Sequence, residues 1–189
     1  SDRKGPVWLD IPSDVQTAEI PDDTKDIEIR PTFSGNESIE SDFVEKFLSY
    51  KQYSRPLFLV GNGIRQSGNV DRFLQLSKQY NIPYVSTYGA RDFSDFYYKL
   101  NLGCIGVKGS RLGNMAMQNC NLLMILGTSL NVSHVGYDAS KFSPNSYKIL
   151  ITNDKSEIYK NIIPLDYLRY MDLTEFFWQI KKIGDDNNE

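Results

Sequence analysis

The 189-residue chain is poor in the residue types that most catalytic centres use. It has one histidine, His134, and two cysteines, Cys104 and Cys120. A single histidine excludes a histidine-rich metal site and any two-histidine mechanism, and two cysteines outside a CxxC pair exclude a disulfide framework. The sequence also lacks the Gly-x-Ser-x-Gly nucleophile elbow, the GxxxxGK[ST] phosphate loop and the HExxH zinc motif. These absences favour a binding or scaffolding domain, or a piece of a larger protein.

An excess of charge of one sign and a long apolar run are missing as well. The chain has 21 basic and 24 acidic residues, which is a net charge of −3. Sequence-independent nucleic-acid binding needs a dense basic face, so this balance argues against it. No apolar run approaches the roughly 20 residues of a membrane span, and residues 1–12 lack the layout of a signal peptide. We expect a cytoplasmic globular protein that binds neither nucleic acid nor a membrane.

The first 35 residues differ in character from the rest. Pro6–Pro12 is a short apolar run that predicts a strand, and it has no neighbouring strand signal. Asp14–Arg30 is acidic with a proline in the middle, which is typical of an extended linker. A lone strand before a linker indicates an excised fragment. The predicted organisation is the end of a preceding domain at 1–13, a linker at 14–35, a central α/β domain at 36–184 and a tail at 185–189.

Strand and helix signals alternate along the rest of the chain. Two continuous apolar runs that end at a glycine, 57–60 and 122–126, predict strands buried on both faces. Further strands are predicted at 82–86, 148–152 and 167–171, and helices at 36–49, 70–77, 109–118 and after Asp154 and Asp172. Asn69 is a predicted N-cap, and Asp154–Glu157 and Asp172–Glu175 have capping-box spacing. The predicted fold is a doubly wound, mostly parallel, Rossmann-like α/β sheet with Phe176 and Phe177 in its core.

Two glycine-rich turns follow the strands predicted to be most buried. In a doubly wound sheet, ligands bind at the carboxyl ends of the strands, where the turns at 61–68 and 127–129 fall. Glycine lets the backbone approach a phosphate, and Arg65 offers a charge-assisted hydrogen bond. Gln66 stands where a GxGxxG fingerprint needs glycine, so tight turns that merely connect strand to helix are the favoured alternative. The candidate nucleotide site consists of Gly61, Gly63, Arg65, Gly127 and Asp154.

The remaining reactive side chains have simpler interpretations. His134 lies in a polar stretch, where a solvated or hydrogen-bonded histidine is favoured over a catalytic one. Cys104 and Cys120 are interpreted as buried small hydrophobic residues, not as nucleophiles. Lys108 and Arg111 flank a glycine and are interpreted as a solvated basic face, with an anion-binding corner as the alternative. We therefore predict no catalytic residue and no metal ligand in this chain.

Several of these motifs together resemble one family. Gly5-Pro6-Val7-x-Leu9-Asp10-Ile11-Pro12 resembles the stretch that ends the pyrimidine-binding domain of thiamine-diphosphate enzymes. The rest of the chain resembles their central domain, so the likeness covers nearly all of the sequence. It rests on Gly61-x-Gly63-x-Arg65-x-Ser67-Gly68, Gly103-x-x-Gly106-x-x-Gly109-Ser110-Arg111, Leu126-Gly127-Thr128-Ser129-Leu130 and Asp154-x-x-Glu157-Ile158. The large subunits of acetolactate synthase (acetohydroxyacid synthase) are the group that the chain resembles most.

This resemblance implies the middle third of a thiamine-diphosphate-dependent carboligase or decarboxylase that acts on a 2-oxo acid such as pyruvate. In the family, the pyrimidine-binding domain supplies the catalytic glutamate, and a later GDG…N motif holds the diphosphate and Mg²⁺. The resemblance therefore implies that this chain alone is inactive. Its implied partners are the flanking pyrimidine- and diphosphate-binding domains, in a homo-oligomer that is a dimer or a tetramer.

The resemblance also raises the question of a flavin. Central domains of acetolactate synthases bind FAD, and some relatives bind ADP. Flavin-binding members typically carry G-A-R-F-D-D-R-V-T-G, whereas this chain has Ser129 and Ser133 in place of the two arginines, and Asn131 and Val132 in place of the two aspartates. These departures disfavour FAD and favour a structural domain. A module that binds FAD, ADP or NAD, or that serves assembly without chemistry of its own, remains the alternative.

Overall fold

The computed structural model describes residues 8–19, 47, 49–95, 97–160 and 162–186. The chain divides into two units, Ser1–Gly35 and Asn36–Glu189, each treated by itself. In the first unit, helix α1 (Ser13–Gln16) follows an extended segment whose residues 8–12 form no strand. The strand prediction is therefore wrong for residues 8–12, while residues 6 and 7 lie outside the described part. A strand needs a partner to satisfy its backbone groups, and this segment is exposed, including Trp8 and Leu9.

The second unit contains a six-stranded sheet in which every neighbouring pair is parallel. Its order is β3-β2-β1-β4-β5-β6, so the direction of winding reverses between β1 and β4. This order confirms the predicted doubly wound, Rossmann-like fold. The strands are β1 (Pro56–Val60), β2 (Tyr84–Ser86), β3 (Asn101–Cys104), β4 (Leu122–Leu126), β5 (Tyr147–Thr152) and β6 (Tyr167–Tyr170).

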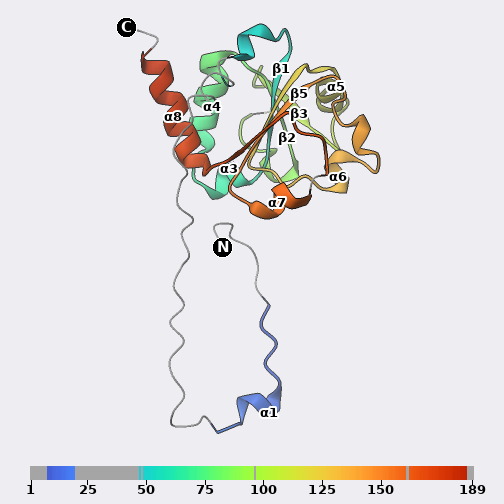
Figure 1. Ribbon diagram of the computed structural model, residues 1–189, viewed down its shortest axis with the longest axis vertical. Helices are drawn as coiled ribbons and strands as arrows, with labels where there is room; N and C mark the ends of the chain where they lie inside the picture. The colour runs from blue at the N-terminus through green and yellow to red at the C-terminus, as the bar shows by residue number, and fades with distance from the viewer. Residues whose placement is uncertain (1–7, 20–46, 48, 96, 161, 187–189) are drawn as a thin grey trace. The chain divides into compact units, whose positions relative to one another are not determined.

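Helices cover both faces of this sheet (Figure 1). Helices α4 and α8 contact each other on one face, and α5 packs on β2 and β3. The helices are α3 (Gly63–Gln66), α4 (Val70–Tyr80), α5 (Arg111–Asn119), α6 (Val132–Val135), α7 (Lys155–Lys160) and α8 (Leu173–Asp186), with 3₁₀ turns η1 (Ser49–Gln52), η2 (Tyr88–Ala90) and η3 (Ala139–Lys141). The predicted helix over 36–49 lies mostly outside the described residues.

The alternation of side chains along β1 divides the core into two layers. Phe58 and Val60 belong to the layer that contains buried residues of α4 and α8, and Leu57 and Leu59 belong to the layer on the opposite face. Because successive strand residues point to opposite faces, a strand covered on both sides must be apolar throughout. The sequence therefore predicted β1 and β4 from their uninterrupted apolar runs.

Aromatic rings fill the layer under α4 and α8. The ring of Phe73 lies edge-on to Phe58 and Tyr84, with centroids 5.7 Å and 5.1 Å away. Phe176 and Phe177 also pack edge to face, at 5.0 Å, which confirms their prediction as core residues. Edge-to-face pairs place the positive rim of one ring on the negative face of the next, which adds to the free energy of burial.

The structure differs from the sequence predictions at strand β3 and in the detail of one predicted helix cap. Strand β3 has no sequence signal, because it is an edge strand and Gly103 has a φ of +98° that favours glycine. Asn69 occupies the predicted N-cap position of α4, but its side chain makes no capping hydrogen bond, and its amide donates to Ser67 and Thr174. Asp172 does cap α8, because its carboxylate accepts a hydrogen bond from the Thr174 N–H at 2.7 Å.

The packing of Phe73 gives a direct test of this core. Phe73→Ala removes a fully buried ring between two other rings, so we expect the free energy of unfolding to fall by about 3–5 kcal/mol. Denaturant unfolding followed by circular dichroism measures this loss. Tyr137→Ala is the control, because this side chain is 99% exposed and its removal should change stability by no more than about 0.5 kcal/mol. Equal losses in the two variants would contradict the described packing.

Candidate functional site

The turns after β1 and β4 touch at the point where the winding of the sheet reverses. The backbone N–H of Gly61 donates to the carbonyl of Leu126 at 3.0 Å, and that of Gly63 donates to the carbonyl of Gly127 at 2.8 Å. Three of the five predicted site residues, Gly61, Gly63 and Gly127, therefore lie together at the expected edge of the sheet. Ligand sites of doubly wound folds form at this edge.

The closeness of the two turns accounts for their glycines. A Cβ atom on Gly61 would overlap the Gly127 carbonyl oxygen and lie 2.6 Å from the Cα of Thr128. A Cβ on Gly63 would lie 2.7 Å from the same carbonyl oxygen, and Gly127 has a φ of +59°. These atoms are backbone atoms, which have little freedom to move aside. The glycines thus allow one turn to approach the other, which is the tight-turn interpretation of the motif.

Arg65 is turned toward the segment that follows β2. One guanidinium nitrogen donates to the Gly89 carbonyl at 2.9 Å, the other pairs with the Asp92 carboxylate, and the group stacks over the Phe93 ring. The hydrogen bond from Arg65 lowers the pKa of Asp92 below its usual value. Arg65 therefore ties the turn after β1 to the connection between β2 and β3, and its charge already has a carboxylate partner.

Asp154 lies at the carboxyl end of β5 and caps α7. Its carboxylate accepts from the Ser156 N–H at 2.9 Å and from the Ser156 hydroxyl at 2.5 Å. Figure 1 shows α7 at the same end of the sheet as α3 and α6. The predicted nucleotide set is thus divided: three glycines pack on one another, while Arg65 and Asp154 each engage a partner within the chain. Nucleotide binding by these five residues stays a prediction.

Glu157 is a central residue of this edge that sequence reasoning missed. Its side chain is only 4% exposed, and its Oε1 accepts from the Ser129 hydroxyl at 2.5 Å and pairs with Lys160 Nζ at 2.6 Å. Its Oε2 accepts from the backbone N–H of Leu130 at 3.3 Å. The capping-box spacing assigned Glu157 to its own helix, whereas the fold brings it against the turn after β4.

The other reactive side chains lie as predicted. His134 is half-buried and its Nδ1 is 3.3 Å from the Ser129 carbonyl oxygen. Cys104 and Cys120 are buried, and burial raises the pKa of both thiols. Lys108 and Arg111 are exposed. Among the described residues, no group of three or more His, Cys, Asp or Glu side chains is placed to hold a metal ion.

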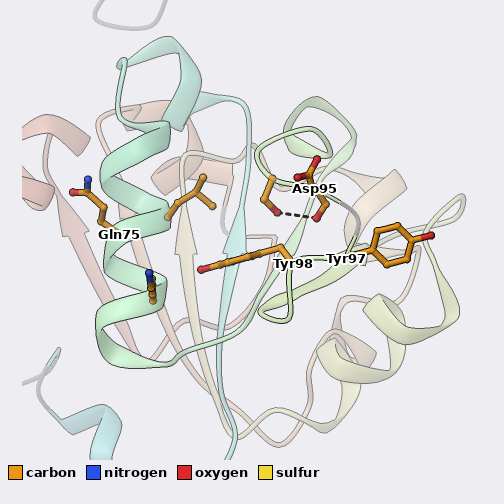
Figure 2. A pocket seen from close by; sticks show the side chains of 7 residues that line it. Gln75, Asp95, Tyr97 and Tyr98 are labelled. Atoms are coloured by element: carbon orange, nitrogen blue, oxygen red, sulfur yellow. Dashed lines mark hydrogen bonds between the residues drawn. The ribbon is translucent and has the colours of Figure 1, made fainter.

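A groove of about 560 Å³ lies apart from this edge, between α4 and the loop that precedes β3 (Figure 2). The hydroxyl of Ser94, which lines the groove, is hydrogen-bonded to the Tyr84 hydroxyl at 2.6 Å. None of the predicted site residues lines the groove, and sequence reasoning gave no signal for it. Its walls are Leu74, Gln75, Lys78, Ser94, Asp95, Tyr97 and Tyr98.

The strand order and the paired glycine turns define the class of this protein, which is a Rossmann-like α/β domain whose edge loops close on one another. The sequence profile of the family "Thiamine pyrophosphate enzyme, central domain" matches residues 48–180. The chain belongs to this family. In the described part of the chain, no helix has the length and apolar composition needed to span a membrane.

Relatives with established names agree with this family. The acetolactate synthase large subunit of Lactococcus lactis subsp. lactis is 29% identical, over 99% of this chain and 33% of its own length. Acetolactate synthase isozyme 1 large subunit of Escherichia coli is 30% identical over 85% of this chain and 28% of its own length. The 3D-(3,5/4)-trihydroxycyclohexane-1,2-dione hydrolase of Listeria monocytogenes is 30% identical over 58% of this chain and 17% of its own length. The chain spans about a third or less of the length of these relatives.

The half-buried His134 predicts a pH dependence of stability. Burial lowers the pKa of His134 below its usual value of 6.5, and the hydrogen bond to Ser129 opposes this only in part. The unfolded chain therefore takes up a proton at higher pH than the folded chain. Stability should be constant above pH 6.5 and fall as the pH drops below it, by at most about 1.4 kcal/mol per pH unit.

Denaturant titrations between pH 5 and pH 8 measure this slope. His134→Gln is the matched variant, because it removes the only histidine in the chain and keeps a polar side chain at that position. The variant should lose the dependence between pH 5.5 and 6.5, where most carboxylates are already ionised. An unchanged slope in the variant would show that another group is responsible.

Proposed function

We propose that this chain is the non-catalytic central domain of a thiamine-diphosphate-dependent enzyme of the acetolactate synthase type, acting on a 2-oxo acid as a carboligase or decarboxylase. The match of residues 48–180 to the central-domain family carries the proposal. The named acetolactate synthases among its relatives support the enzyme class. A nucleotide-binding or assembly module without an enzyme around it is not favoured by these relatives.

Thiamine diphosphate and Mg²⁺ have no matching ligand set in the described residues. The sequence lacks the GDG motif, and no carboxylate-rich cluster suited to a metal is found in the part of the chain that the structure describes. Magnesium prefers carboxylate and other oxygen ligands together with substrate phosphates. In the proposed enzyme, parts of the protein beyond this chain hold both groups, and no chemical step involves a residue of this domain.

The architecture supports a scaffolding role for the domain. The glycine contact joins the turns after β1 and β4, and Arg65 joins the first of these turns to the connection between β2 and β3. A domain whose turns are joined by such contacts can serve as a rigid spacer between two neighbouring domains. In our proposal, the flanking pyrimidine- and diphosphate-binding domains dock on this spacer, and the whole enzyme is a homo-oligomer, a dimer or a tetramer.

The exposed apolar side chains of the first unit fit the same proposal. Trp8, Leu9 and Ile11 are 90%, 79% and 54% exposed. A run of large apolar side chains in water marks a surface that another part of a protein covers. We assign that cover to the preceding domain. Two buried thiols without a disulfide are compatible with a reducing compartment, so the cytoplasm is the proposed location.

The full-length protein provides the test of this function. We expect carbon dioxide release from pyruvate, or from another 2-oxo acid in a panel, that requires both added thiamine diphosphate and Mg²⁺. The measurement is carbon dioxide release coupled with mass spectrometry of the products, with each cofactor omitted in turn. Preparations of the 189-residue chain serve as the control and should show no turnover under the same conditions.

Two results would decide against the proposal. Turnover that persists without thiamine diphosphate would show that the protein is not a thiamine-diphosphate-dependent enzyme. Turnover by the 189-residue chain alone would show that this domain has catalytic groups of its own. A product that carries the acyl group of one substrate on a second 2-oxo acid would identify a carboligase, and an aldehyde would identify a decarboxylase.

A further inference from the structure

The turn after β4 holds a carboxylate of its own chain in the way that proteins hold a small anion. Glu157 reaches it from the first turn of α7, 28 residues further along the chain than Ser129. A backbone N–H, a hydroxyl and an ammonium converge on the two carboxylate oxygens, from Leu130, Ser129 and Lys160. Charge-assisted hydrogen bonds from such donors are the strong interactions by which proteins hold an anion.

The carboxylate of this arrangement is buried, whereas its lysine partner reaches the surface. The Glu157 side chain is 4% exposed, and Lys160 is 40% exposed. Burying a carboxylate costs several kcal/mol unless it is paired and its oxygens are hydrogen-bonded. Lys160 also donates to the Ser129 hydroxyl at 3.2 Å, so the three side chains form a closed triangle. The fold therefore uses a buried charge to hold this turn.

In the turn after β1, the groups that could bind a dinucleotide are already engaged within the chain. Gly61 and Gly63 are packed against the backbone of Gly127 and Thr128, where even one added carbon atom would overlap it. Arg65, the cation of the first turn, is paired with Asp92 and hydrogen-bonded to Gly89. The Arg65 guanidinium, the Ser129 hydroxyl and the Leu130 N–H are thus already bonded to carboxylates of the same chain. Because these described donors are engaged within the chain, they do not fit the diphosphate of FAD.

We infer that the Glu157 carboxylate is an internal anion that holds the turn after β4, so that this central domain keeps its edge turns in place without FAD or another dinucleotide. The inference goes beyond the proposed function, which concerns the chemistry of the whole enzyme and is silent on what holds this turn. It assigns Glu157, Ser129 and Lys160 a joint role in positioning this turn.

Chemical rescue tests the inference on the 189-residue chain. Glu157→Ala removes an acetate-sized group and leaves its donors in place. We expect the melting temperature of this variant to be lower than that of the unaltered chain. Sodium acetate should restore at least half of the loss, whereas sodium chloride at the same ionic strength should not. Acetate is the probe because it replaces the atoms that the substitution removes.

Glu175→Ala is the matched control. Glu175 has the same position in its helix as Glu157, three residues after a capping aspartate, but its carboxylate accepts from the Gln179 amide at 2.6 Å and lies on α8. Acetate should have no specific effect on this variant. An equal acetate effect in the two variants, or none in Glu157→Ala, would overturn the internal-anion assignment.

A second variant keeps the test decisive if Glu157→Ala does not fold. Glu157→Gln removes the charge but fills the space, so it should be destabilised and should not respond to acetate; a specific acetate response in this variant would overturn the assignment. Calorimetric titration of the unaltered chain with FAD, ADP and NAD completes the test. We expect no binding, and micromolar binding of any of the three would overturn the inference that this edge is held without a dinucleotide. These results leave the assay of the full-length enzyme untouched, so the two proposals fail separately.

Discussion

The backbone contact between the turns after β1 and β4 is the constraint on which the carboxyl edge of the sheet depends. Parallel neighbours in the sheet bring Val60 and Leu126 into register, so the two chains leave the sheet side by side. They stay in contact only because neither turn carries a side chain at the point of approach. In many doubly wound folds, such glycines make room for a ligand; here they make room for each other.

The charged side chains at this edge are likewise paired within the chain. Two charged side chains at these turns each have a partner of opposite charge from the same chain: Arg65 has Asp92, and Glu157 has Lys160. A buried or half-buried charge without such a partner would be costly, and it is often the mark of an active site. The paired arrangement supports the scaffolding role that we propose for this domain.

The two layers of the core explain how this domain stays rigid. The apolar strands β1 and β4 are buried on both faces, and aromatic rings interlock under α4 and α8. The segments after β1 and β4 add Ile64 and Leu130 to these layers, so the core also anchors the carboxyl edge of the sheet. Beside Leu130, the Ser129 hydroxyl donates to the Glu157 carboxylate.

The sequence by itself determined the fold class, the central strands and the core aromatics, because periodicity and glycine-terminated apolar runs are local properties of the chain. It also placed Gly61, Gly63 and Gly127 together at the carboxyl edge of the sheet, since the strand that precedes each turn is recognisable. Sequence alone missed the edge strand β3 and gave Glu157 to the wrong partner, because both depend on segments far apart in the chain. Which glycine faces which carbonyl, and which carboxylate meets the turn after β4, was decided only by tertiary packing, because these contacts join residues that no local pattern relates.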